Sequence, residues 1–389
     1  MRVLFFTTSG SYHGGGVMCL IEMLEYIRKT DCEPYVIIPT HGSVEPLLNE
    51  MKIPYGVIRT YDWLVDTRVR DTSGFKKKRA IRQLINKLAE KRFYQFMKKN
   101  KIEAFHLNSA FNPTGVKSAK KLNIPVIWHL REFAENGEPT PVFDNADTAF
   151  RTMASADVLV AVSDCIKAYY QSKMPGANIV TIYDGIKIDD LLPTSNMKSL
   201  FKGDTVRLTS VGGIAPIKGF EDAISAVARC RDKFGLNCTL TIVGRMRNEA
   251  YLNKLHELAD DLGIADRIAF YGECNEMSKI WKQTDIVLVC SKSESFGRVA
   301  VEAMANGLPV IGANNTGTSE ILPVECQYQK DENDALVNKI CEVYRCFESG
   351  KEAEKLKVRQ SDAKRSYNIE RSARELLTVI RECFKATNS

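Results

Sequence analysis

The sequence predicts an α/β protein made of two doubly wound, Rossmann-like domains. Short apolar segments rich in β-branched residues alternate with amphipathic helical segments along most of the chain, which is typical of a parallel sheet covered on both faces by helices. The alternation stops at a polar stretch after "IVTIYDG" and then starts again. The length of 389 residues is too great for one ordinary core and suits two or three domains.

In the first half, strands are predicted where short apolar runs end at turn residues, and helices where apolar residues recur with a helical period. The predicted order is strand 2–8, helix 15–29, strand 34–40, helix 44–51, a basic helical stretch 76–101, strand 102–109, helix 113–122, strand 124–130, a strand ending near 163, helix 164–174 and strand 179–185. We therefore assign residues 1–185 to the first domain and the polar stretch 186–204 to a linker.

The second half repeats the alternation. It runs through strand 205–212, helix 219–234, strand 237–244, helix 249–264, strand 267–273, helix 276–283, strand 285–291, helix 297–307 and strand 308–314. One long helical region is expected from about Asp331 onward, with a break near 366–368. We assign residues 205–365 to the second domain and 366–389 to a terminal helix that packs back on the first. Because doubly wound sheets bind ligands at the carboxyl ends of their strands, residues just after the strands are the site candidates.

The composition fits a globular protein and narrows its class. Hydrophobic residues make up 44% and charged residues 26% of the chain, and the net charge is a modest +6. No apolar run approaches the roughly 18 residues needed to cross a bilayer, and the apolar core of "MRVLFFTTSG" is too short for a secretion signal. The 11 cysteines are scattered and form no CxxC pair, which argues against a disulfide framework or a zinc site and favours a reduced, cytoplasmic compartment.

Two glutamates define the most informative motif, "SKSESFGRVAVEAMANGLPV". Glu294 lies in the loop after a strand, and Glu302 lies eight positions later in an otherwise apolar helix, where a carboxylate requires a hydrogen-bonding partner. The amides at the start of this helix would attract an anion or sugar hydroxyl groups, so the two carboxylates suit a polyhydroxyl ligand. From the spacing alone, a solvated Glu294 and a Glu302 that caps a neighbouring loop fit equally well.

Three further turns after strands carry candidate residues. In "SVGGIAPIKGFEDAI", Lys218 and its flanking glycines suit a diphosphate, although a surface lysine in a turn is the better interpretation of this motif taken alone. In "IPVIWHLREFAE", His129 ends an apolar strand, and a histidine that only positions a loop is an equal alternative. The glycine-rich turn "TTSGSYHGGGVMCL" is not a GxGxxG motif and does not favour a dinucleotide.

Taken together, these motifs resemble family 4 of the retaining glycosyltransferases, which has the GT-B fold. The resemblance rests on the two glutamates, on "KG" at 218–219, "GLPVI" at 307–311 and "GTSE" at 317–320, and it is strongest between 206 and 322. It implies a nucleotide-sugar donor, with UDP expected, and transfer of a hexose or N-acetylhexosamine to a glycan or lipid-linked acceptor in surface polysaccharide biosynthesis. The first domain would bind the acceptor and the second the donor.

The resemblance also implies roles for individual residues. Glu302 would hold the ribose hydroxyl groups, Glu294 the donor sugar and Lys218 the diphosphate, while His129 would lie near the reacting sugar and Glu273 near the base. The resulting catalytic set is His129, Lys218 and Glu294. The donor-binding set is Gly15, Gly16, Lys218, Arg245, Glu273, Glu294, Ser295, Phe296, Gly297, Arg298 and Glu302. Retention would follow from substitution on the same face of the sugar, and no metal or other cofactor is expected because the chain has no D-x-D motif.

One position departs from the family pattern. Members commonly carry an arginine two residues after the first strand of the donor domain, where this chain has Gly213. A phosphate contact is then either missing or replaced by Arg245 or Arg298.

The stretch 76–101 is strongly basic and has apolar residues at roughly helical spacing. Such a helix suits peripheral contact with the anionic inner face of the cell membrane, and a lipid-linked acceptor would explain it; an ordinary helix with a solvated charged face is an equal alternative. Nucleic acid is not an expected partner, because the stretch lacks interleaved aromatic residues. A nucleotide-sugar 2-epimerase and a non-catalytic glycan-binding partner of a glycosyltransferase are the alternative functions.

Overall fold

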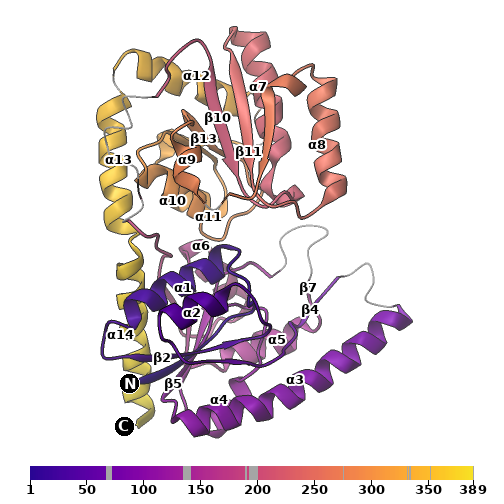
Figure 1. Cartoon of the computed structure of the whole chain (residues 1–389), viewed down its shortest axis with the longest axis vertical. Helices are drawn as coiled ribbons and strands as arrows, with labels where there is room; N and C mark the ends of the chain where they lie inside the picture. The colour runs from indigo at the N-terminus through magenta and orange to yellow at the C-terminus, as the bar shows by residue number, and fades with distance from the viewer. Residues whose placement is uncertain are drawn as a thin grey trace. The chain divides into compact units, whose positions relative to one another are not determined.

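The computed structural model describes residues 1–66, 72–134, 142–188, 191, 200–274, 276–330, 332, 334–350 and 352–388. The chain divides into two compact units, which we call unit 1 (Met1–Gly185 with Ile369–Ser389) and unit 2 (Ile186–Asn368). Each unit contains one main sheet with helices on both faces (Figure 1). Most of the expected linker, 189–190 and 192–199, lies outside the described residues.

Unit 1 is built on a seven-stranded parallel sheet with the order β3-β2-β1-β5-β6-β8-β9. The strands are β1 Arg2–Phe6, β2 Glu33–Ile38, β3 Tyr55–Val57, β5 Ala104–Leu107, β6 Val126–Leu130, β8 Val158–Ala161 and β9 Ile179–Thr181. Chain order reverses between β1 and β5, which makes their carboxyl ends the switch point where such sheets bind ligands. A separate antiparallel pair joins β4 Leu64–Val65 to β7 Val142–Phe143.

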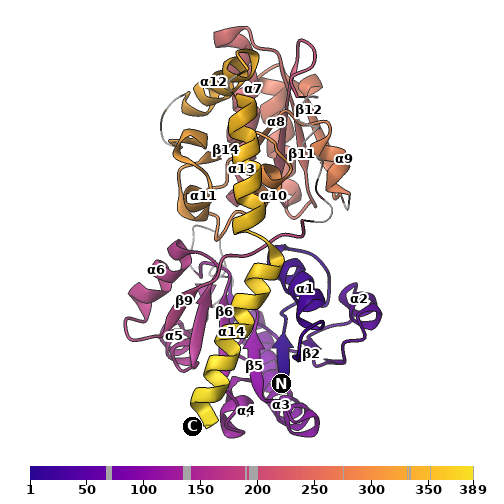
Figure 2. The same cartoon turned by 90° about the vertical axis from the view of Figure 1, so that its left-hand side faces the viewer.

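The helices of unit 1 include one from the far end of the sequence. They are α1 Gly15–Ile27, α2 Val44–Glu50, α3 Ser73–Asn100, α4 Val116–Lys121, α5 Ala146–Ala154, α6 Asp164–Lys173 and α14 Ile369–Asn388. Helix α14 lies beside α1 (Figure 2). It buries Ala373, Leu376, Leu377 and Ile380, one helical stripe, in the core that α1 shares with the sheet. Burial of each large side chain contributes about 1.5–3 kcal/mol, so α14 is an integral part of unit 1.

Unit 2 contains a six-stranded parallel sheet with the order β12-β11-β10-β13-β14-β15. The strands are β10 Val206–Val211, β11 Cys238–Val243, β12 Ile268–Gly272, β13 Ile286–Val289, β14 Val310–Ala313 and β15 Gln327–Tyr328. The helices are η2 Pro216–Lys218, α7 Phe220–Phe234, α8 Glu249–Asp261, η3 Ala265–Arg267, α9 Met277–Trp281, α10 Arg298–Ala305, α11 Thr316–Ile321, η4 Val324–Cys326, α12 Ala335–Glu348 and α13 Glu352–Ser366. Chain order reverses between β10 and β13, so the switch point lies at the ends of these two strands.

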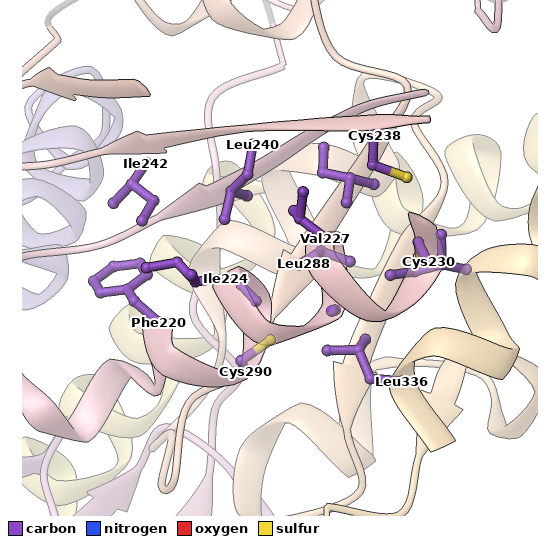
Figure 3. Packing of buried hydrophobic residues seen from close by; sticks show 14 of the residues in the cluster. Phe220, Ile224, Val227, Cys230, Cys238, Leu240, Ile242, Leu288, Cys290 and Leu336 are labelled. Atoms are coloured by element: carbon purple, nitrogen blue, oxygen red, sulfur yellow. The ribbon is translucent and has the colours of Figure 1, made fainter. Parts of the chain in front are cut away.

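The core of unit 2 is centred on helix α7. Figure 3 shows Phe220, Ile224 and Val227 of α7 against Leu240 and Ile242 of β11. These side chains recur every three or four residues along α7, which directs them to the sheet. The helix begins after Gly219, which ends the 3₁₀ turn η2, and stops before Gly235; both glycines have positive φ (61° and 60°), as is common just past the end of a helix.

Both sheets are parallel and doubly wound, as predicted, but the prediction of one long helix from Asp331 to the break near 366 is wrong. Helix α12 ends at Glu348 and α13 begins at Glu352, and between them Gly350 has φ 73°. Glycine reaches this conformation at no steric cost, so the dipeptide "SG" at 349–350 could have been used to predict the end of α12. Strands β3, β4, β7 and β15 and helix α5 were not predicted from the sequence. All 11 cysteines are free, and among the described helices none combines the length and hydropathy needed to cross a bilayer.

Candidate functional site

The central pair of predicted residues in unit 2 meets at the switch point of its sheet. Strands β10 and β13 are neighbours, with Leu208 opposite Ile286. Lys218 ends the 3₁₀ turn that follows β10, and Glu294 lies in the loop that follows β13. Because both strands are parallel, the residues after them emerge at the same edge, and two side chains 76 positions apart come into contact.

Lys218 and Glu294 form a partly buried ion pair. The Lys218 ammonium donates a hydrogen bond to Glu294 Oε1, and Ser291 Oγ donates to the same oxygen at 2.7 Å. The two side chains are 25% and 18% exposed. The carboxylate is therefore held in a fixed orientation by two donors, and the ammonium and the carboxylate form one unit at the edge of the sheet.

The loop that carries Glu294 is fixed by the "GTSE" segment. Glu294 N donates to Thr316 Oγ1 at 2.8 Å, and Gly317 N donates to Glu294 O at 2.8 Å. A Cβ at position 317 would lie 2.7 Å from Ser295 O, so only glycine permits this approach. The two motifs noted separately in the sequence thus form one structure.

Helix α10 supplies the partner that the sequence required for Glu302. Arg298 Nε donates to Glu302 Oε1 at 2.8 Å, and the two side chains are 15% and 23% exposed. The partner lies one turn earlier on the same helix rather than in a neighbouring loop. Gly297 precedes the helix with φ 98°, and the buried Phe296 packs its ring on Tyr367 with centroids 5.7 Å apart.

The turn between β10 and α7 also depends on a glycine. Gly219 has φ 61°, and a Cβ there would lie 2.2 Å from Cys290 O at the end of β13. Lys292 N donates to Ile217 O at 2.8 Å. The turn after β10 and the loop after β13 are therefore packed directly on each other, which sets the position of Lys218 relative to Glu294.

The other two predicted donor residues of unit 2 lie along the same edge. Arg245 follows β11 and Glu273 follows β12, one and two strands beyond β10, and both are exposed. Their loops are joined by a hydrogen bond from Gly244 N to Gly272 O of 2.7 Å.

In unit 1, the predicted glycines lie at the corresponding switch point. Gly15 and Gly16 begin α1. Asn108 Nδ2, just after β5, donates to Gly16 O at 2.8 Å, and a Cβ at Gly16 would lie 3.0 Å from Arg131 Cδ. The glycine turn is therefore packed against polar side chains from two neighbouring strands.

The structure adds a buried ion pair that the sequence analysis missed. Arg131 Nη1 lies 2.7 and 2.6 Å from the two carboxylate oxygens of Asp184, and Arg131 Nε donates to Asn108 Oδ1 at 2.8 Å. Arg131 and Asp184 are only 5% and 7% exposed. The available signals were Arg131 directly after the buried strand β6, in "WHLREF", and Asp184 three residues after β9, in "IYDG".

The structure does not support a direct contact between His129 and a reacting sugar. The His129 ring is 1% exposed and lies 3.2 Å from His106, measured from Nδ1 to Nε2. Burial, with Arg131 nearby, lowers the pKa of His106 to about 3 and holds that of His129 well below its usual range. Both rings are neutral at physiological pH, and His129 is a buried residue of β6.

Glu132, three residues after His129 in the sequence, is a buried carboxyl group that accepts several hydrogen bonds. Ser109 Oγ donates to its two oxygens at 3.1 and 3.2 Å, and Ala110 N donates at 3.3 Å. Burial raises the pKa of Glu132 to about 7, against the effect of these donors.

No group of three or more His, Cys, Asp or Glu side chains in the described ranges is arranged to hold a metal ion. A hollow of about 410 Å³ lies in unit 1 between α3 and the β4–β7 pair. None of the predicted site residues lines it; its walls include Trp63, Phe75, Arg79 and Arg82.

Comparison with known proteins places a family on each unit. The model described as Glycosyltransferase Family 4 matches residues 13–190, and the model described as Glycosyl transferases group 1 matches residues 194–357. Together they match most of the chain.

Curated relatives match over part of their length. D-inositol 3-phosphate glycosyltransferase of Thermobifida fusca is 32% identical over 182 residues, 42% of this chain and 41% of the relative. N-acetyl-alpha-D-glucosaminyl L-malate synthase of Bacillus anthracis is 27% identical over 181 residues, 43% and 44% of the two chains. The chain thus spans about two fifths of the length of the curated relatives it matches.

Solved structures match over nearly the whole chain. HepE of Anabaena in complex with UDP has a TM-score of 0.78 at 21% identity and covers 98% of this chain and 100% of its own; HepE has also been solved with UDP-glucose. WaaG, a glycosyltransferase involved in lipopolysaccharide biosynthesis, has a TM-score of 0.68 at 15% identity, with 97% and 99% covered. At these identities the likeness shows the fold, which is that of the GT-B glycosyltransferases.

Proposed function

Because the chain is a glycosyltransferase of family 4 with the GT-B fold, we propose that it moves a hexose or N-acetylhexosamine from a UDP-sugar with retention of configuration. The observation that carries this proposal is the meeting of Lys218 and Glu294 at the switch point of unit 2. One cation and one oriented carboxylate at this edge suit the two parts of the donor. The ammonium suits the diphosphate, and the carboxylate accepts hydrogen bonds from sugar hydroxyl groups.

The main chemical requirement of the transfer is that the site stabilises the departing diphosphate. The bond from the anomeric carbon to the diphosphate oxygen breaks, and a bond to the acceptor oxygen forms on the same face of the sugar. The acceptor hydroxyl gives its proton to the departing phosphate, so no protein base is needed. Negative charge grows on the diphosphate as the bond breaks, and a fixed cation such as Lys218 lowers the barrier by stabilising it. Glu302, oriented by Arg298, would accept hydrogen bonds from the ribose hydroxyl groups.

UDP as the nucleotide is supported by the complexes of HepE with UDP and UDP-glucose. A glycan or lipid-linked acceptor and a role in surface polysaccharide biosynthesis are in keeping with the involvement of WaaG in lipopolysaccharide biosynthesis. The remaining proposed donor residues are Gly15, Gly16, Arg245, Glu273, Ser295, Phe296 and Gly297.

Binding of UDP tests the donor directly. UDP and UDP-glucose should raise the melting temperature of the protein, because a ligand at 100 times its Kd adds about 2.7 kcal/mol to the stability of the state that binds it. ADP and GDP should give smaller shifts. In Glu302→Gln the UDP shift should shrink, whereas in Glu257→Gln, an exposed position of α8, it should be unchanged. If neither UDP nor UDP-glucose changes the melting temperature of the wild-type protein, the proposed donor is wrong.

We also propose that helix α3 rests on an anionic membrane, which would bring a lipid-linked acceptor to unit 1. Ile81 and Leu84 are each 59% exposed and Leu88 is 51% exposed, one stripe at helical spacing. The helix is rich in lysine and arginine, and its sole acidic residue, Glu90, is engaged with Gly115 N and Ser118 Oγ at 2.8 and 2.6 Å. An exposed apolar stripe among cations is the pattern of an interfacial helix.

Vesicle sedimentation tests this proposal. The protein should sediment with phosphatidylglycerol vesicles at low salt and be released at high salt, because the attraction between charges is screened. Replacing Ile81, Leu84 and Leu88 by serine should abolish sedimentation. Val358→Ser, at a 59% exposed position of α13, should leave it intact. Equal sedimentation with neutral phosphatidylcholine vesicles, or none with either lipid, would refute the proposed contact.

A further inference from the structure

Two consecutive glycines in unit 2, Gly212 and Gly213, each lie against a cationic side chain. A Cβ at Gly212 would be 3.1 Å from both Cδ and Cε of Lys218. A Cβ at Gly213 would be 2.7 Å from Nε and 2.9 Å from Cδ of Arg247, and the next atom, at 3.4 Å, is Arg247 Cγ. Arg247 therefore fills the space that a side chain at position 213 would need.

The backbone on both sides of Arg247 is fixed. Ile214 N donates to Arg245 O at 2.9 Å, and Ile214 also forms a β-bridge with Met246. On the other side, Asn248 Oδ1 accepts from Tyr251 N at 3.0 Å as the N-cap of α8. The main chain of this loop is therefore anchored on both sides of Arg247. This anchoring places the Arg247 side chain beside Gly213, although the residue is exposed.

The cations around the switch point differ in whether a carboxylate already engages them. Three other cations of this edge already have carboxylate partners: Lys218 pairs with Glu294, Arg298 with Glu302 and Lys330 with Asp222. Over the ranges that the structure describes, Arg247 has neither a hydrogen bond nor an ion pair. A nucleoside diphosphate carries about two to three negative charges, and one ammonium already shared with a carboxylate does not balance them.

We propose that Arg247 is a phosphate-binding residue of the donor site, which acts beside Lys218 and takes the place of a side chain at position 213. This proposal rests on the proposed function. A guanidinium offers several donors in a planar fork that matches phosphate oxygens. Neither Arg245 nor Arg298, the replacements considered from the sequence, fits as well, because Arg298 is engaged with Glu302 and it is Arg247 rather than Arg245 that lies on Gly213.

Calorimetric titration with UDP, UMP and uridine tests this assignment. Arg247→Met should weaken UDP about tenfold, because it removes a charge-assisted hydrogen bond, and should hardly change uridine. Lys254→Met, which removes an exposed cation of α8, is the matched control and should change UDP binding less than threefold. Gly213→Ala should weaken UDP as Arg247→Met does, since its new methyl group displaces the guanidinium; in the Arg247→Ala background it should have no further effect.

Moving the arginine from position 247 to position 213 distinguishes the loss of a cation from a change in the shape of the loop. In Arg247→Ala the three atoms nearest to a Cβ at position 213 are gone, so Gly213→Arg is accommodated and should restore UDP affinity to within about threefold of wild type. If wild type binds none of UDP, ADP or GDP, the proposed function itself fails. If wild type binds UDP and Arg247→Met binds it equally well, the proposed function stands and the role of Arg247 is refuted.

Discussion

Glu294→Gln is expected to lower the rate of glycosyl transfer, measured as slow hydrolysis of a UDP-sugar without acceptor, by about 100-fold to 1,000-fold. This is the range for the loss of one oriented polar group that stabilises charge in a transition state. The amide keeps the shape of the side chain and its acceptor for Ser291, but it removes the negative charge beside Lys218. It also turns one acceptor for sugar hydroxyl groups into a donor, so the sugar loses its orientation along with the ammonium.

The variant is informative only if the fold is kept. The main-chain bonds from Glu294 to Thr316 and Gly317 do not involve the carboxylate, so the melting temperature of Glu294→Gln should stay within a few degrees of wild type. Glu257→Gln, on the exposed side of α8, is the control and should hydrolyse the donor at the wild-type rate. Hydrolysis by Glu294→Gln at more than a tenth of the wild-type rate would show that this carboxylate does not touch the reacting sugar.

Much of this site could be predicted from the sequence because local rules place it. Strand ends, helix starts and glycine turns can each be predicted from a few consecutive residues. These local signals located Lys218, Glu294 and Gly297 without any knowledge of strand order. The partner of Glu302 could also have been found, since Arg298 stands four residues earlier on the same helix and such pairs face each other. That partner was instead expected to be the ligand or, as the alternative, the amides of a neighbouring loop.

Other features depend on which strands are neighbours, and no local rule supplies that. The contact between Lys218 and Glu294 requires β10 beside β13, and the packing of Arg247 on Gly213 requires the loops after β10 and β11 to meet. The burial of His129 follows in the same way. As the penultimate residue of β6 it was expected at an open edge, but β6 is buried along its whole length and the His106 ring packs against His129. The pair of β4 with β7 joins residues nearly 80 positions apart, and two-residue strands carry no periodic signal.

Asp184→Asn is expected to destabilise unit 1 by about 3–5 kcal/mol, the usual cost of leaving one member of a buried ion pair without its counter-charge. Asp184 contacts Arg131 Nη1 with both oxygens, and the guanidinium is 5% exposed. The substitution is isosteric, so the loss comes from the charge and not from a cavity. Urea unfolding at pH 7 should show it, followed by the fluorescence of Trp63 and Trp128 of unit 1 in a Trp281→Phe background that silences unit 2.

A double variant separates the cost of an orphaned charge from the net worth of the pair. Arg131→Met with Asp184→Leu removes both charges from the interior, and it should recover most of the stability lost in Asp184→Asn, because buried pairs are commonly replaceable by apolar side chains of similar volume. Glu375→Gln, which breaks the exposed pair with Arg371 on α14, should cost less than about 1 kcal/mol. If Asp184→Asn costs no more than Glu375→Gln, water reaches the Arg131 guanidinium and the pair is not buried in solution. If the double variant is no more stable than Asp184→Asn, the pair itself holds the end of β6 to the end of β9, and with it the polar contacts behind the glycine turn of α1.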